Sequence, residues 1–396
     1  MRAGPARGPA AGRRGTPGGK STVEMSHVHS LRLARSHLEP RAGRRQLARV
    51  VADVCGVQAQ FIPSAELALL ARIDGLRKGD MARALWEDRT LVRTWTMRGT
   101  IHLHTKEELP VYLKALERSR TRVDMSWLGR KGIAPRDVDR VVEAVVDALA
   151  GGPLTRAELG PEVALRVGEW ARPLVEDSWG GAVRLACFRG LVCFGPVRGR
   201  SATFVRTDRW LGPLRDLTPE EAQDELVTSY LRAYGPATVK DLWRWAALPM
   251  SEARPAWERA MPGLVEVSVG GRRAWALRDD AAALGRPSPG RWGAARLLGS
   301  FDGYLLAHDD RSHLFTKEQG RSISRGAGWI SPVVLSRGRA IGTWRQGPGK
   351  GLAIDVAPFG PPGREVRAQV AREAERLGSF LGLGARVAWG GRGGRD

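Results

Sequence analysis

The sequence predicts an α+β protein with three tandem helical modules, each closed by a β-hairpin, and a small C-terminal β domain. The main observation is an internal repeat, in which residues 152–159 (GPLTRAEL) align with residues 235–242 (GPATVKDL). In both copies a threonine stands three positions before an acidic residue, which is the signature of a capped helix start. The second observation is a change to β-type runs in the last third of the chain.

The second and third modules follow from this repeat. An amphipathic helix pattern precedes each copy, and a further helix and two short strands follow it. The expected strands are 191–195 and 201–206 after the first copy, and 264–269 and 273–277 after the second. The order helix, capped helix, helix, hairpin is that of a winged helix. We therefore predict winged helices at 134–212 and 217–280.

A first module of the same kind is predicted at 25–120, on a weaker pattern. The expected elements are helices near 44–55, 64–73 and 80–88, and strands near 91–96 and 100–104 joined by a turn at 97–99.

The C-terminal domain is predicted at 290–389. It combines β-type runs with a final amphipathic helix and a Gly/Arg-rich tail that we expect to be disordered. The β-type runs are 328–335, 340–344 and 352–357, and the helix pattern covers 366–381.

The charge of the chain indicates a polyanionic partner. Its 396 residues are enough for two to four domains, and its net charge is +21. The basic residues are mostly arginine and are spread over the whole chain, which favours a long nucleic-acid groove over an acidic membrane surface. Arginine-rich composition also follows from a GC-rich genome. No apolar run approaches the roughly 20 residues of a membrane span.

Cysteine usage and the N-terminus suggest a cytoplasmic protein. Cys55, Cys187 and Cys193 lack metal-ligand spacing, and their odd number argues against a disulfide framework. Residues 1–24 are rich in Gly, Pro, Ala and Arg, and we expect a disordered basic arm. A start-site artefact with Met25 as the true start, or an organelle transit peptide, are the alternatives.

Gln58 and Gln60 are the most informative polar pair. Gly56 before them and Pro63 after them favour an extended stretch, in which both glutamines point to one side and Ala59 points to the other. Taken alone, such a pair is more often simply solvated.

Histidines do not make a convincing metal site. His102 and His104 share a face of a predicted strand, as His27 and His29 do in their stretch. A metal needs at least one more ligand, and none is evident. We therefore predict no metal and no cofactor.

Several motifs in order along residues 30–360 resemble the AlkZ/YcaQ family of winged-helix DNA glycosylases. The combination is specific, whereas each motif alone is not. The AlkZ-like branch of that family has glutamine in the last position of the first motif, as at Gln60, and the YcaQ-like branch has aspartate there. The motifs are VQAQ at 57–60, LVRTWTMRGTIHL at 91–103, FDGYLL at 301–306, DRS at 310–312, and 328–335 followed by GRAIGTW at 338–344.

The resemblance implies three winged helices around double-stranded DNA and a monofunctional glycosylase that acts on N7-alkylated guanine, with bulky adducts and interstrand crosslinks as the wider set of substrates. It implies catalytic roles for Gln58 and Gln60, with Gln60 holding the attacking water. We expect a monomer. The candidate DNA-contacting residues are Arg98, His102, Arg198, Arg200, Arg311, Arg337 and Arg339.

Two other classes remain open from sequence. A non-enzymatic winged-helix regulator would bind DNA without releasing a base, and a lesion-binding protein would recognise damage without turnover. The three unequal modules disfavour the regulator, because regulators more naturally read palindromes as symmetric dimers.

Overall fold

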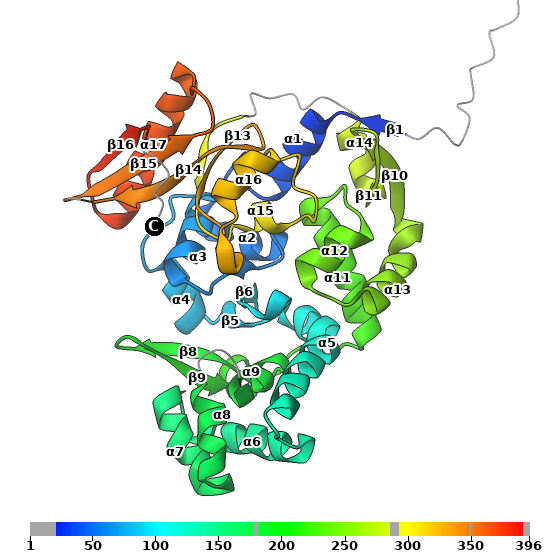
Figure 1. Cartoon of the computed structure of the whole chain (residues 1–396), viewed down its shortest axis with the longest axis vertical. Coiled ribbons are helices and arrows are strands. Elements are labelled where there is room, and N and C mark those ends of the chain that lie inside the picture. The colour runs from blue at the N-terminus through cyan, green and yellow to red at the C-terminus, as the bar shows by residue number, and fades with distance from the viewer. Residues whose placement is uncertain (1–20, 178–180, 286–292, 349, 391–396) are drawn as a thin grey trace, which may run out of the picture.

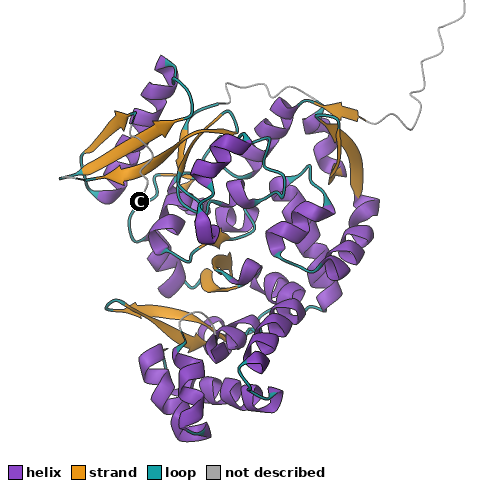
Figure 2. Ribbon diagram, in the orientation of Figure 1, coloured by secondary structure: helices purple, strands orange, loops and turns teal. Residues whose placement is uncertain are grey.

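A computed structural model describes residues 21–177, 181–285, 293–348 and 350–390. Helices dominate, and in the described residues the strands form five small, separate sheets (Figure 2). This mixture confirms the predicted α+β class. None of the described helices is long and apolar enough to cross a membrane.

The start of the described chain packs on its third module. Strand β1 (Ser21–Val23) pairs in parallel with β10 (Leu264–Val269), and α1 (Met25–Arg35) contacts α11 (Pro219–Tyr234). Buried Arg32 fixes this contact by donating to the carbonyl oxygen of Pro236 at 2.7 Å. The expected disorder of residues 1–24 is therefore wrong for β1, and residues 1–20 lie outside the described residues.

The first module has the elements that its sequence predicts. Strand β3 adds to the hairpin of β5 and β6, so that the sheet order is β3-β6-β5. A second, two-stranded sheet pairs β2 with β4. The bounds are β2 (Ala42–Gly43), α2 (Leu47–Asp53), β3 (Val57–Gln58), α3 (Ile62–Leu70), β4 (Ile73–Asp74), α4 (Asp80–Trp86), β5 (Leu91–Trp95) and β6 (Ile101–Thr105).

A long helix joins the modules. Helix α5 (Leu109–Arg130) has 22 residues and crosses the boundary that we predicted at residue 120. It contacts α11 of the third module and α9 of the second (Figure 1). The predicted end of the first module at residue 120 therefore falls inside a continuous helix, and the division into modules stays a prediction.

The second and third segments contain the predicted capped helices. The Thr155 hydroxyl accepts from the Glu158 amide, and Thr238 accepts from Asp241, both at 3.3 Å. A hairpin follows the helices in each, as expected, and its assignment as a wing stays a prediction. The bounds are α6 (Pro135–Ala148), β7 (Leu154–Thr155), α7 (Arg156–Val167), α8 (Arg172–Glu176), α9 (Gly181–Phe188), β8 (Val192–Arg198), β9 (Ser201–Arg206) and α10 (Thr207–Leu211), then α12 (Val239–Ala246), α13 (Met250–Ala260), β11 (Arg272–Leu277) and α14 (Ala281–Leu284).

The C-terminal part is a five-stranded sheet in sequence order, β12 to β16, with α17 packed on it (Figure 1). Strand β16 was not predicted, and β13 is shorter than the expected run at 328–335. The bounds are β12 (Arg296–Leu298), α15 (Gly303–Leu306), α16 (Lys317–Ile323), β13 (Val333–Ser336), β14 (Arg339–Gly347), β15 (Leu352–Pro358), α17 (Arg364–Leu381) and β16 (Ala385–Trp389). Of the Gly/Arg tail, residues 391–396 lie outside the described residues.

A buried ion pair ties this C-terminal part to the first module. Both Arg72 and Asp302 are almost completely buried, and their side chains form two hydrogen bonds of 2.7 Å. Asp302 also accepts from the Tyr304 amide at 3.0 Å, which starts α15. The pair fixes the short segment around residue 301 against the end of α3.

Candidate active site

Gln58 lies in extended backbone, as predicted, whereas Gln60 lies at a bend just after β3. Gln58 is opposite His102 in the pairing of β3 with β6, and the Ala59 amide donates to the Ile101 carbonyl at 2.7 Å. Ala59 is fully buried, whereas both glutamine side chains line one cleft. Gly56 makes the turn into β3 possible, because its φ is +87° and a Cβ there would lie 2.6 Å from the His104 ring.

Arg98 fixes the orientation of Gln58. Its Nη2 donates to the Gln58 Oε1 at 3.1 Å, and its Nη1 donates to the Trp245 carbonyl at 2.5 Å. A guanidinium can only donate, so the facing Gln58 atom must be the carbonyl oxygen. The two N–H groups of the Gln58 amide are therefore not committed to this contact and are available as donors.

His102 holds Arg98 in place through a hydrogen bond. The same Arg98 Nη2 lies 3.1 Å from the His102 Nε2, which must accept, so the His102 Nδ1 carries the proton and donates to the Thr100 carbonyl at 3.0 Å. Burial, and then the charge of Arg98, lower the pKa of His102 well below its usual 6.5. His102 is thus a neutral acceptor. The expectation that it contacts DNA is wrong here, because it is 1% exposed.

Gln60 is held from the backbone. The Ile101 amide donates to its Oε1 at 3.3 Å, and the Gln60 side chain is exposed at the cleft. Its N–H groups are likewise not committed to this contact. Two neighbouring amides with anchored oxygens therefore face one space.

The cleft has a volume of about 970 Å³ and is strongly basic. Among the described residues that line it, Asp309 is the one carboxylate, and Asp309 pairs with the Lys240 Nζ at 2.8 Å. The lining arginines come from several modules and from the C-terminal part. They are Arg98, Arg120, Arg184, Arg244, Arg311 and Arg325.

The electrostatics of the cleft favour an anion. Burial, with the neighbouring charges of Arg120 and Arg244, lowers the pKa of Arg98 to about 10, so Arg98 stays cationic at neutral pH. Burial also lowers the pKa of Arg311, with Arg244 as the next cause. Guanidiniums that lower one another's pKa repel one another, and a phosphate bound between them offsets this repulsion and stabilises their charged forms.

Two of the predicted DNA-contacting arginines lie at the cleft, and two others lie outside it. Arg98 is at the predicted turn but is half-buried against Gln58 rather than exposed, and Arg311 lines the cleft. Arg198 pairs with Glu158 at 2.5 Å, and neither it nor Arg200 lines the cleft. DNA contact by these two stays a prediction.

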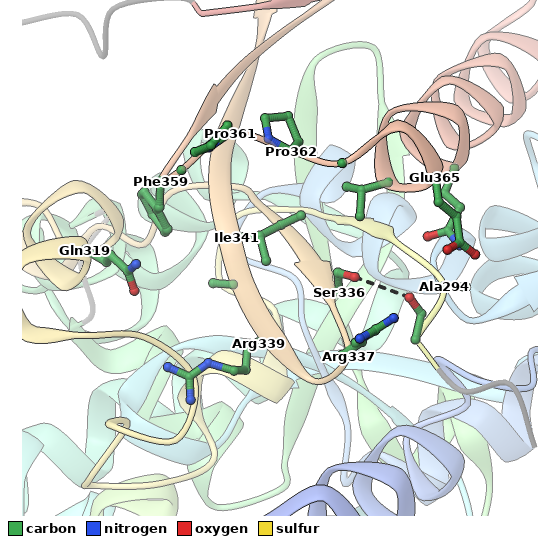
Figure 3. A pocket seen from close by; sticks show the side chains of 16 residues that line it. Ala294, Gln319, Ser336, Arg337, Arg339, Ile341, Phe359, Pro361, Pro362 and Glu365 are labelled. Carbon is green, nitrogen blue, oxygen red and sulfur yellow. Dashed lines mark hydrogen bonds between the residues drawn. The ribbon is translucent and has the colours of Figure 1, made fainter. Parts of the chain in front are cut away.

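Arg337 and Arg339 line a second cavity, of about 1060 Å³, in the C-terminal part (Figure 3). Arg339 donates to the His313 carbonyl at 3.2 Å. Both side chains are thus placed apart from the glutamines, and their contact with DNA also stays a prediction.

Sequence reasoning missed four cleft arginines and an aromatic group. Arg244 and Trp243 had a local signal, because they lie on the capped helix of the second repeat copy. No sequence signal distinguished Arg120, Arg184 and Arg325 among the 63 basic residues of the chain. In the part of the chain that the structure describes, no three His, Cys, Asp or Glu side chains are placed to hold a metal.

Comparisons with known proteins agree with this geometry. The family model for AlkZ-like DNA glycosylases matches residues 51–380, which include both glutamines. The chain belongs to the AlkZ-like DNA glycosylase family. It is 36% identical over 364 residues to an interstrand DNA cross-link repair glycosylase of Streptomyces sahachiroi, covering 90% of this chain and 96% of that protein. The solved structure of the Streptomyces sahachiroi DNA glycosylase AlkZ superposes with a TM-score of 0.82 at 32% identity, covering 93% of this chain and 100% of that one.

Family membership makes the chain an AlkZ-like glycosylase, and so an enzyme rather than a regulator. The matched region spans the cleft and the helices, sheets and turns that build it.

Proposed function

We propose that this AlkZ-like glycosylase hydrolyses the N-glycosidic bond of guanine alkylated at N7 in double-stranded DNA. The observation that carries the proposal is the pair of glutamine amides, anchored by Arg98 and by the Ile101 amide, in an arginine-lined cleft. The arginines would hold phosphates, and the amides would act at the sugar.

The lack of an available acid in the cleft suits a lesion whose base leaves without being protonated. Alkylation at N7 gives guanine a positive charge, so the base leaves without protonation by an acid. The cleft offers little acid help, since Asp309 is its one described carboxylate and is paired with Lys240. A neutral base such as uracil would need stronger activation of the leaving group.

The two glutamines have different roles in this proposal. An amide is too weak a base to remove a proton from water, but it can orient water by accepting and donating hydrogen bonds. We assign the water to Gln60, which is exposed in the cleft, and to Gln58 the donation of N–H bonds to the sugar, a phosphate or the same water. Positioning of this kind lowers barriers by roughly 7–11 kcal/mol at best.

Crosslink unhooking belongs to the same proposal. The Streptomyces sahachiroi relative is named for interstrand cross-link repair, and an open cleft of about 970 Å³ suits a bulky adduct. We propose that the enzyme acts as a cytoplasmic monomer, with three winged helices around the duplex. Its activity would serve general repair or protection against a genotoxin made by the same cell.

The test is base release from three matched duplexes, which carry one N7-methylguanine, one N7-linked interstrand crosslink or one uracil. We expect release from the first two and little from the third. Uracil release as fast as N7-methylguanine release would contradict the proposed selectivity.

A further inference from the structure

Three aromatic rings meet at the cleft beside the glutamines. Phe61 directly follows Gln60, Phe301 follows β12, and Trp329 precedes β13. The ring centroids of Phe61 and Phe301 are 6.1 Å apart and nearly parallel, and Trp329 lies 5.8 Å from Phe61 and 5.0 Å from Phe301. All three residues line the same cleft as Gln58 and Gln60.

Two of these rings are left open to solvent, whereas Phe301 is partly buried against the core of the C-terminal part. Phe61 is 47% exposed and Trp329 is 39% exposed. By contrast Trp95, which also lines the cleft, is 5% exposed because it packs on Phe194 and Phe204. Exposed aromatic surface of this kind marks a place of contact with a partner.

The backbone holds Phe301 in an unusual position. Its φ is +61°, a left-handed conformation that a bulky side chain rarely adopts. The next residue, Asp302, is locked by its buried ion pair with Arg72. Strain that is maintained by a buried ion pair beside a binding cleft is typical of a functional position.

We propose that Phe61, Phe301 and Trp329 form a stacking site that holds one flat aromatic ring of the DNA substrate next to Gln60. This inference rests on the proposed glycosylase function. The basic lining of the cleft selects nucleic acid over an apolar protein partner, and every nucleobase has a face on which such rings stack. The ring bound is an unstacked base or the aromatic part of a bulky adduct.

Stacking at this site would help to position the substrate in the proposed mechanism. Phe61 is adjacent in sequence to Gln60, so a ring held on Phe61 lies close to the sugar whose bond is broken. A base displaced from the helix has to lose its neighbours, and the aromatic site replaces part of that stacking. The site would thus hold the duplex open at the lesion without a deep pocket.

The test compares Phe61→Leu and Trp329→Leu with Trp170→Leu as the control. Trp170 is 42% exposed and does not line the cleft. The dissociation constant is measured for a duplex with one N7-methylguanine beside a fluorescent 2-aminopurine, and for a duplex with a bulky N7 adduct that carries an aromatic ring. We expect the two cleft variants to bind about fivefold or more weakly.

The two duplexes show whether the ring bound at the stacking site is a nucleobase or part of the adduct. Weaker binding of both duplexes, with loss of the 2-aminopurine signal for unstacking, assigns the site to a base. Weaker binding of the bulky adduct alone assigns it to the adduct. Trp329→Phe should recover most of the lost affinity, which separates stacking from a folding defect.

Unchanged dissociation constants for both cleft variants on both duplexes would overturn the inference. Failure of the proposed function would look different, because the wild-type protein would then release no base from either duplex. The affinity measurement reports stacking in that case as well.

Discussion

At the scale of single residues, Arg98 organises the site. It joins the first module to the third, because one guanidinium contacts both Gln58 and the Trp245 carbonyl. It also makes the His102 Nε2 a hydrogen-bond acceptor, which fixes the histidine tautomer. In the proposed mechanism Arg98 is therefore a positioning residue that sets which atoms Gln58 offers to the substrate.

Replacing Arg98 by lysine should slow the chemical step more than it weakens DNA binding. One ammonium cannot make the three contacts of the guanidinium fork. Loss of a charged hydrogen bond of about 1.5–3 kcal/mol predicts a roughly ten- to hundredfold lower single-turnover rate. Arg120→Lys is the matched control, since Arg120 lines the cleft and donates to Ala247. It should alter the dissociation constant instead, and equal effects of both variants on the rate would contradict this role.

The sequence indicated the glutamines and Arg98 but not the contacts between them. Alternation in extended backbone places Gln58 and Gln60 on one side from local geometry alone. The orientation of Arg98 depends on the Trp245 carbonyl, which is 147 residues away along the chain. The burial of His102 is also a tertiary effect, so residue type and strand position wrongly predicted a surface contact.

At the scale of elements, local start signals were the reliable predictors. Capping boxes placed α7, α11 and α12 at Thr155, Thr218 and Thr238. Strand β16 escaped prediction because it forms by parallel pairing with β15 across the whole of α17. Helix α5 crosses the boundary that we predicted at residue 120, since it packs on both the second and the third module.

Loss of the cap on α12 should affect both stability and binding. Thr238→Ala removes the hydroxyl that accepts from the Asp241 amide, which predicts a loss of about 1 kcal/mol in the free energy of unfolding. Affinity for DNA should also fall, because α12 presents Trp243 and Arg244 to the cleft. Thr218→Ala, in the same kind of cap on α11, should cost similar stability with little change in affinity. An equal loss of affinity in both variants would count against this view of α12.

At the scale of the whole molecule, the chain keeps several histidines neutral within a strongly basic fold. Burial is the first cause of each lowered pKa, which falls to about 4 in His29 and to about 3 in His104. The same holds for His102, His308 and His313. The positive charge of nearby arginines also lowers the pKa of most of these histidines. Both burial and this charge therefore oppose their protonation.

The free energy of unfolding should therefore decrease as the pH falls from 7.5 to 5. Below pH 6.5 the unfolded chain takes up protons that the folded histidines do not, at about 1.4 kcal/mol per pH unit for each net proton. Glu108, Glu66 and Asp124 act in the opposite direction, since burial raises their pKa, to about 7 in Glu108, but they are three groups against five. Denaturant titrations at pH 7.5, 6 and 5 measure this dependence. Equal stability at all three values would contradict the neutral state of these histidines.

The most direct test of the central claim is the single-turnover release of N7-methylguanine from duplex DNA by Gln60→Ala and by the wild type. The dissociation constant is measured in parallel at the same salt concentration. Loss of the positioned water predicts a rate at least about a hundredfold lower, with binding retained. A near-wild-type rate at unchanged affinity would show that Gln60 does not hold the attacking water.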